Sequence, residues 1–335
     1  MVAGAIIAYM LKFLPRLSFL LLALCAAPIM CAQAEWFSAI QDKMGTRVEV
    51  RLWHDDEKEA EQLIALAMTE FDRIEAAMST YLSNSEITRI NETAAAQPVT
   101  VSPELFALIE RALQLSVTTN GAFDITYDSV GQLYDFRAGT RPAPEQIAAQ
   151  LDAINYRHVQ LDREISTIRF ARPEVRINLG GIAKGYAVES VIDVLRDAGV
   201  TNGLATAGGD TRLLGDRGNG PWTVGIRDPD DTDGLLTRLT LQDEAISTSG
   251  DYERFFIEDG VRYHHILNPS TGRSAGKLHS VTIIGPDATM TDGLSTSVFV
   301  LGADAGLALI ESLEDYETLL VDIEQRVRFS SGLAH

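Results

Sequence analysis

The chain has 335 residues, of which 46% are hydrophobic, and its 47 acidic residues outnumber the 28 basic ones to give a formal charge of −19. A chain of this length and composition can bury a large core, which excludes an intrinsically disordered protein. Because so acidic a surface repels the phosphates of nucleic acids, we expect no nucleic acid partner.

Residues 1–34 have the composition of a secretory leader. They contain no Asp or Glu, place Lys12 and Arg16 ahead of an apolar run, and end in Ala-Gln-Ala. A basic start, an apolar core of roughly 15 residues and a small-x-small cleavage site are typical of a signal peptide. The pattern predicts a signal peptide over 1–34 and one exported domain over 35–335.

The two cysteines, Cys25 and Cys31, both lie within this leader. Each follows a large apolar residue, Leu24 or Met30, where a lipid-attachment signal would have a small one. We therefore expect an exported protein without a lipid anchor. Removal of the leader leaves no thiol, which excludes disulfides, cysteine nucleophiles and thiolate metal sites from the mature domain.

The elements predicted in the first half of the chain are mostly helical. Alternating residues predict a strand over 46–53, and apolar residues at helical spacing predict a helix over 57–78. Ser102 and Pro103 are typical of an N-cap and the first position of a second helix. A third helix is expected over 142–155.

The second half is richer in strands. Residues 159–178 read as a hairpin and its continuation, and a helix is expected from Gly185 to Ala198. Short strands broken by Gly, Asp and Asn follow, before two helices and a closing hairpin. Helices early and mostly antiparallel strands later indicate an α+β fold, largely antiparallel sheets with flanking helices, in a single functional unit.

The stretch "NLGGIAKGYAVE" over 178–189 places three glycines and Lys184 where a strand turns into a helix. Bare backbone, the N–H groups of a helix start and one cation are suited to a phosphate ligand. The spacing matches no nucleotide-binding motif, and glycine packing at the turn explains it equally well. A second glycine turn, "TAGGD" over 206–210, serves the same ligand or is a tight strand bend.

Asp292 and Thr296 in "TDGLSTS" are four residues apart at an expected helix start, so their oxygens share one face. One carboxylate, one hydroxyl and several waters suit Mg²⁺, although an N-terminal Asp and a capping Thr would look the same. Ser297 replaces the last glycine of a nucleophile elbow, which leaves a serine hydrolase unsupported.

The stretch "RYHHILNPSTG" over 262–272 contains adjacent histidines. On a strand, Tyr263 and His265 share one face and His264 takes the other, so the pair is no zinc motif. A histidine there is a general base or a structural residue. The stretch "GAFDIT" over 121–126 is, by itself, an ordinary strand start with a core aromatic.

Together these motifs resemble the ApbE family, the FAD:protein FMN transferases. The resemblance covers nearly the whole mature chain, from Met44 to about Gly302. It rests on nine motifs in order: "MGTRVEV", "MSTYLSNSEITRIN", "GAFDIT", "INLGGIAKGYAVE", "ATAGGDTRLLG", "WTVGIRDP", "AISTSGDYERFF", "YHHILNPSTG" and "TDGLSTSVFVLG".

The resemblance implies a T-fold-like, Mg²⁺-dependent periplasmic enzyme that takes FAD as substrate. It would transfer FMN to a threonine or serine hydroxyl of an acceptor flavoprotein, at a Ser/Thr-Gly-Ala-Thr-like site, and release AMP. By the same resemblance, the FAD contacts are Met44, Tyr81, Ala122, Phe123, Asp124, Asn178, Lys184 and Ile266. The metal ligands are Gly181, Asp292 and Thr296, and the candidate base is His265.

Two positions depart from the family pattern. The family usually has Asp where this chain has Asn178, and often Asp-Pro-Arg-Thr-Gly where this chain has Asn268 and Ser270. Asn178 can still hydrogen-bond a ligand but carries no charge. Two further functions use the same residues: an FAD pyrophosphatase giving FMN and AMP, and a flavin carrier without catalysis. A carrier would need neither a metal site nor a base.

Overall fold

The structure, a computed structural model, describes residues 34–229, 231 and 234–333. The predicted signal peptide, apart from Ala34, lies outside the described residues. Residues 35–335 form one compact unit. Within the described part of the chain, no helix has the length and apolar character needed to cross a membrane.

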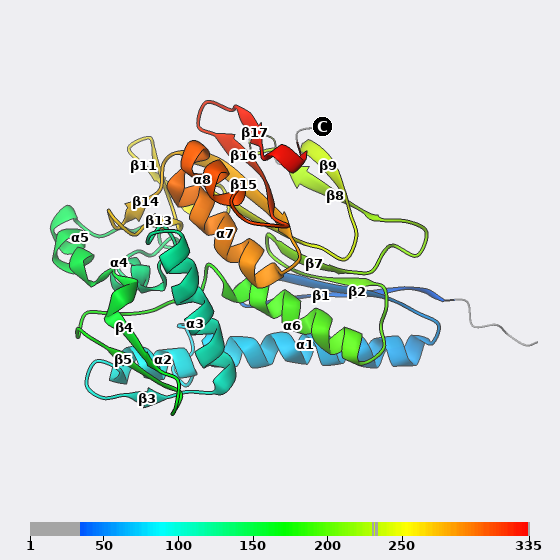
Figure 1. The fold of residues 1–335 in the computed structure, drawn as a ribbon, viewed down its shortest axis with the longest axis horizontal. Helices are drawn as coiled ribbons and strands as arrows, with labels where there is room; N and C mark the ends of the chain where they lie inside the picture. Colours follow the sequence, from blue (N-terminus) through cyan, green and yellow to red (C-terminus); the bar gives the residue numbers. More distant parts are fainter. Residues whose placement is uncertain (1–33, 230, 232–233, 334–335) are drawn as a thin grey trace, which may run out of the picture. The chain divides into compact units, whose positions relative to one another are not determined.

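A large antiparallel sheet forms the centre of the unit (Figure 1). Among the described residues it has eight strands, in the order β1-β2-β6-β7-β10-β15-β16-β17, and every neighbouring pair is antiparallel. Their bounds are β1 (Glu35–Lys43), β2 (Thr46–His54), β6 (Gly203–Ala207), β7 (Asp210–Leu214), β10 (Ala245–Gly250), β15 (Leu278–Gly285), β16 (Glu317–Asp322) and β17 (Val327–Phe329).

Helices cover one face of this sheet in the same order as the strands beneath them. Helix α1 (Glu57–Met78) lies on β1 and β2, and α6 (Ala183–Asp197) on β6 and β7. Helix α7 (Ala288–Leu301) lies on β10 and β15, and α8 (Ala303–Ile310) on β16. Because α6 and α7 also pack against each other, residues more than 100 positions apart meet at their contact.

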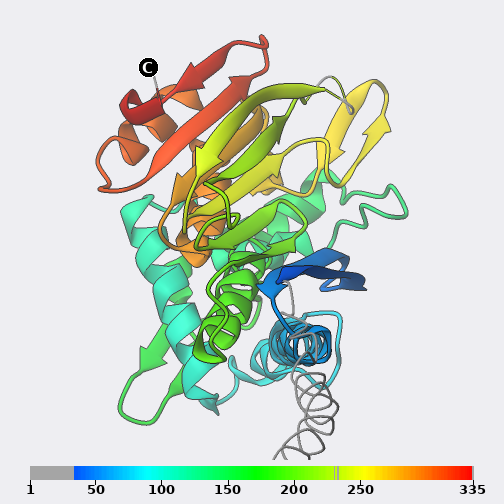
Figure 2. The same ribbon diagram turned by 90° about the vertical axis from the view of Figure 1, so that its right-hand side faces the viewer.

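The other face of the sheet carries a two-stranded ribbon of β8 (Trp222–Arg227) and β9 (Leu235–Leu241) (Figure 2). Alternate residues of a strand point to opposite faces, so Leu320 packs in the helix-side core while Leu319 packs against the ribbon. Trp36 stands edge-on to Trp222 with ring centroids 5.2 Å apart. Both faces of the central strands of the sheet are therefore buried.

Smaller elements lie beyond one end of these layers. They include two longer helices, three short sheets and several short turns of helix. Their bounds are α2 (Glu86–Thr93), α3 (Pro103–Thr118), α4 (Asp128–Gly131), α5 (Pro144–Gln150), β3 (Val99–Thr100), β4 (Val159–Asp162), β5 (Thr167–Phe170), β11 (Phe255–Glu258), β12 (Val261–His264), β13 (Leu267–Asn268) and β14 (Arg273–Ser274).

The predicted α+β class with mostly antiparallel sheets is confirmed, as are the helix over 57–78 and the Ser102 cap, whose Oγ accepts from the Leu105 N–H at 3.3 Å. The single helix over 142–155 is wrong. Helix α5 ends at Gln150 and a separate 3₁₀ turn follows. The chain then turns because the Tyr156 N–H donates to the Asp124 carboxylate at 2.8 Å, a contact that no local pattern shows.

Candidate functional site

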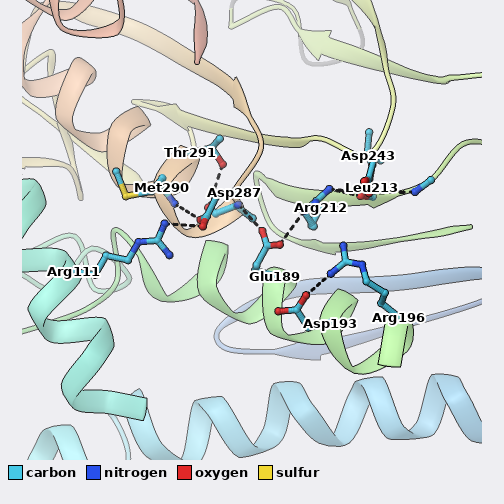
Figure 3. Close-up of polar contacts among 12 residues, drawn as sticks. Arg111, Glu189, Asp193, Arg196, Arg212, Leu213, Asp243, Asp287, Met290 and Thr291 are labelled. Carbon is cyan, nitrogen blue, oxygen red and sulfur yellow. Dashed lines mark hydrogen bonds and ion pairs between the residues drawn. The ribbon is translucent and has the colours of Figure 1, made fainter. Parts of the chain in front are cut away.

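The start of α7 is held in place by a partly buried network of ion pairs and hydrogen bonds (Figure 3). Asp287 caps the helix and accepts from the Arg111 guanidinium of α3 at 2.7 Å. Glu189 of α6 accepts from the Ala288 N–H at 2.7 Å and from Arg212 of β7 at 3.0 Å. Helices α3 and α6 therefore both bond to the first turn of α7, and Arg212 of β7 supports this contact through Glu189.

Asp292 lies in that next turn, with 2% of its surface exposed. It is not at the helix start, as the sequence suggested, because α7 begins at Ala288. Its Oδ2 accepts from the Gly185 N–H at 2.9 Å, and its Oδ1 lies 3.4 Å from the Lys184 Nζ. Lys184 also forms an ion pair with Asp210, the first residue of β7.

With both carboxylates ionised, this group of one cation and two carboxylates has a net charge of −1. Burial, followed by the charge of Asp210, raises the pKa of Asp292 above its usual range. Burial alone would lower the pKa of Lys184, but the two carboxylates outweigh it and raise that pKa. Lys184 therefore keeps its charge, and the excess negative charge favours a bound cation.

Gly185 is needed for helix packing. A Cβ at this position would lie 2.1 Å from the Ala288 carbonyl oxygen and 2.6 Å from the Asp292 Cβ. The N–H groups of Gly185 and Gly180 are already bonded inside the protein, to Asp292 and to Asn178. Of the two explanations for the glycine-rich turn, packing therefore accounts for Gly185, and neither of these N–H groups is available to a phosphate.

The predicted metal ligands are brought together. A Cβ on Gly181 would lie 3.3 Å from the Thr296 Oγ1, one turn along α7 from Asp292. The carboxylate, hydroxyl and backbone groups offered here are oxygen donors, which suit a hard divalent cation. Among the described residues no cluster of three or more His, Cys, Asp or Glu could hold a metal, so a site here depends on neutral oxygens as well.

The adjacent histidines have different environments. Both ring nitrogens of His264 are bonded, Nε2 to the Ala275 carbonyl oxygen at 2.6 Å and Nδ1 to the Ile266 N–H at 3.3 Å. The Nδ1 of His265 is buried with no hydrogen-bond partner among the described residues. Burial, and then the charges of Arg254, His264 and Lys184, lower the pKa of His265 to about 3. His264 is thus the structural histidine, and His265 is neutral and unsatisfied.

Met44 lies in the β1–β2 turn with a positive φ of 52°. Its N–H donates to Glu75 at 2.9 Å, and the carbonyl of its neighbour Gly45 accepts from the Arg254 guanidinium at 3.0 Å. A cleft of about 390 Å³ beside this turn is lined by residues that include Gly45, Glu75 and Arg137. Met44, a predicted flavin contact, therefore lies beside an open cleft. Its turn is linked to His265 through Arg254, whose own carbonyl accepts from the His265 N–H.

Asn178 is the centre of a second set of contacts. Its amide donates to the Thr80 hydroxyl at 3.4 Å and to the Asp128 carboxylate at 3.2 Å. Tyr81, next to Thr80, has 89% of its surface exposed. An exposed aromatic ring can serve as a stacking surface for a planar ligand, which is the role that the family resemblance implies for Tyr81.

The remaining predicted FAD contacts differ in what their side chains can offer. The Phe123 ring lies 3.3 Å from a Cβ built on Gly181, so it packs beneath the glycine turn. Asp124 accepts internal hydrogen bonds from Thr126 and Tyr156 on both carboxylate oxygens, which makes it a support for this loop. Ala122 is half-buried, and Ile266 is buried one residue beyond His265.

Three residues at this site were missed by sequence reasoning. Asp210 holds Lys184, Arg254 bonds to Gly45, and the Ser249 hydroxyl lies 3.5 Å from that of Thr296. Asp210 was visible in "TAGGD", and the other two in "AISTSGDYERFF", as polar residues beside glycine turns. Their partners lie far away in the sequence, so no spacing rule identified them.

Comparison with known proteins identifies the family to which this chain belongs. The family model described as the ApbE family matches residues 44–320, and the chain belongs to that family. A protein of Vibrio cholerae named FAD:protein FMN transferase is 34% identical over 255 residues, covering 73% of this chain and 76% of the relative. A Klebsiella pneumoniae protein of the same name is 33% identical, over 86% of this chain and 92% of its own.

Solved structures agree with this assignment. The crystal structure of the ApbE protein from Thermotoga maritima matches with a TM-score of 0.82 and 31% identity, covering 89% of this chain and 98% of that one. The flavin transferase ApbE from Vibrio cholerae matches with a TM-score of 0.80 and 29% identity, over the same shares.

Proposed function

We propose that this enzyme transfers the FMN half of FAD to a threonine or serine hydroxyl of an acceptor flavoprotein and releases AMP. The named relatives are FAD:protein FMN transferases, and the chain spans most of their length. Mg²⁺ dependence, the hydroxyl acceptor and the roles of individual residues are parts of the proposal.

The observation that carries it is the Nδ1 of His265, which is buried and has no hydrogen-bond partner in the described part of the chain. Leaving a buried polar atom unsatisfied costs about 1–3 kcal/mol, and the neighbouring His264 shows that this loop can satisfy a histidine completely. A neutral imidazole beside Lys184 and Arg254 can accept a proton when an anionic substrate offsets those cations. His265 therefore has the environment of a general base that works in the substrate complex.

The transfer balances without an oxidant or reductant. The acceptor hydroxyl oxygen forms a bond to the phosphorus of the FMN phosphate, and its proton passes to His265. The bond from that phosphorus to the oxygen bridging to AMP breaks, and AMP leaves with the electron pair. Because such transfers depend on position and charge neutralisation, a fixed cation and a fixed base are what the protein must supply.

Lys184 is the fixed cation, since Asp210 and Asp292 hold it from two sides. The ligands for Mg²⁺ would be Asp292, Thr296 and the backbone of Gly181, and the ion would neutralise charge on the pyrophosphate when bound. Contacts to the rest of FAD come from the residues that the family resemblance indicates: Met44, Tyr81, Ala122, Phe123, Asp124, Asn178 and Ile266.

The acceptor we propose carries a Ser/Thr-Gly-Ala-Thr-like site. Export to the periplasm by cleavage of residues 1–34 is part of the same proposal and rests on the composition of that segment. An FAD pyrophosphatase would use the same groups with water as the nucleophile.

One experiment separates these functions. The protein is incubated with FAD, Mg²⁺ and an acceptor domain carrying that site, then denatured and examined for in-gel flavin fluorescence, with AMP and FMN measured by chromatography. A fluorescent acceptor and an equal amount of AMP are expected. Free FMN and AMP without a fluorescent acceptor would indicate a pyrophosphatase, and unchanged FAD would indicate a carrier.

A further inference from the structure

Arg254 joins two distant parts of the site. Its guanidinium Nη2 donates to the Gly45 carbonyl oxygen at 3.0 Å, across 209 positions of sequence. Its own carbonyl accepts from the His265 N–H at 3.1 Å. One residue therefore bonds both to the turn that carries Met44 and to the residue that we propose as the base.

Arg254 also differs from the arginines around it. Arg254 lies directly before the β11–β12 hairpin. Arg262 of that hairpin pairs with Asp251 at 2.6 Å, and Arg141, from another part of the chain, pairs with Glu258 of the hairpin. No carboxylate in the described part of the chain lies within ion-pair distance of Arg254. Arg254 is exposed, and no carboxylate of the described residues is paired with its charge, although the chain is rich in acidic residues.

We propose that Arg254 is a positioning residue for flavin transfer, which fixes the Met44–Gly45 turn and His265 relative to each other and keeps a positive charge beside the base. This inference rests on the proposed function. It assigns to Arg254 no contact with substrate, and it predicts a larger effect on the rate than on FAD binding.

Two effects follow if the guanidinium is removed. The Met44–Gly45 turn loses its hydrogen bond to Arg254 and can shift relative to His265. A displacement of about 1 Å at a reacting centre can cost about 100-fold in rate. The charges that face His265 are those of Arg254, His264 and Lys184, so removing the first lets the imidazole bind a proton more readily. The acidic limb of the rate profile should then move to higher pH, by about 0.5 to 1 pH unit.

The test compares Arg254→Ala and Arg254→Lys with the parent and with Arg196→Ala. Arg196 is a suitable control because its ion pair with Asp193 lies at the exposed end of α6, away from the site. For each protein kcat, KM for FAD, the pH profile of transfer and the melting temperature are measured. Ring ¹⁵N NMR signals of His265 give a readout that does not require transfer.

We expect Arg254→Ala to lower kcat by about 10- to 100-fold, with KM for FAD within about threefold and an unchanged melting temperature. Arg254→Lys, which keeps the charge and one donor, should recover most of the rate and the parent pH profile. The inference is overturned if kcat of Arg254→Ala stays within about threefold of the parent, if only KM rises, or if the His265 ring signals are unmoved. A parent that forms no flavin adduct refutes the proposed function, and the NMR signals then still show whether Arg254 affects the His265 ring.

Discussion

The close approach of α6 and α7 can be tested with one added methyl group. In Gly185→Ala the new Cβ would meet the Ala288 carbonyl oxygen at 2.1 Å and the Asp292 Cβ at 2.6 Å. Both distances are far below van der Waals contact, and the first obstacle is backbone, which cannot rotate away. The helices must therefore separate, and the bond from the Gly185 N–H to Asp292 must lengthen.

Overpacking of a well-packed contact costs about 1–3 kcal/mol, and a clash with backbone belongs at the upper end of that range. At roughly 2 °C per kcal/mol for a chain of this size, the melting temperature should fall by about 6 °C. Flavin transfer should fall further than stability, because Asp292 and Lys184 move with the helices. Calorimetry and the in-gel fluorescence assay measure the two effects.

Gly276→Ala is the matched control. A Cβ at Gly276 would meet no atom within 4 Å, and its φ is not positive, so this variant should melt within about 1 °C of the parent. If Gly185→Ala has the melting temperature of the parent and of this control, α6 and α7 do not approach each other as closely as described. The geometry described for Lys184, Asp210 and Asp292 would then be wrong as well.

Three further predictions concern individual side chains. Asp292→Ala should abolish Mg²⁺-dependent transfer in a folded protein, and unchanged turnover would exclude Asp292 as a ligand. Tyr81→Ala should weaken FAD binding, measured by fluorescence quenching, by about 1–3 kcal/mol without changing stability, since the ring is exposed; equal affinity would remove Tyr81 from the site. The pKa of His265 is about 3 in the folded protein against 6.5 normally, so the unfolded chain binds the proton first and stability falls below pH 6.5. Between pH 7.5 and pH 5 the parent should lose about 2 kcal/mol more of its unfolding free energy than His265→Gln, measured by urea unfolding, and equal losses in both proteins would contradict that pKa.

Local chemistry predicted much of the fold. The apolar stripe of 57–78 and the Ser102-Pro103 pair define helices because caps and periodicity are properties of neighbouring residues. The prediction of one helix over 142–155 failed because α5 ends at Gln150 and a distant carboxylate, Asp124, holds the turn beyond it. Boundaries set by such contacts cannot be read from a segment alone.

The site, like the fold, could be predicted where its features depend on neighbouring residues and not where they depend on distant contacts. The four-residue spacing of Asp292 and Thr296 was enough to place their side chains on one face of a helix. The role of Gly185 was left open between packing and phosphate binding, and only the contact with Ala288 decides it. Asp210 and Arg254 were missed because each acts on a partner, Lys184 or Gly45, from another part of the chain.

The central claim is that His265 is the base for flavin transfer, and one variant tests it most directly. His265→Ala is compared with the parent for FAD affinity, by fluorescence quenching, and for the initial rate of FMN attachment to the acceptor between pH 5.5 and 9. The account predicts an affinity near that of the parent and a rate lower by about 10²- to 10⁴-fold. A rate within about threefold of the parent, or an affinity that collapses together with the rate, would contradict it and leave His265 a packing or binding residue.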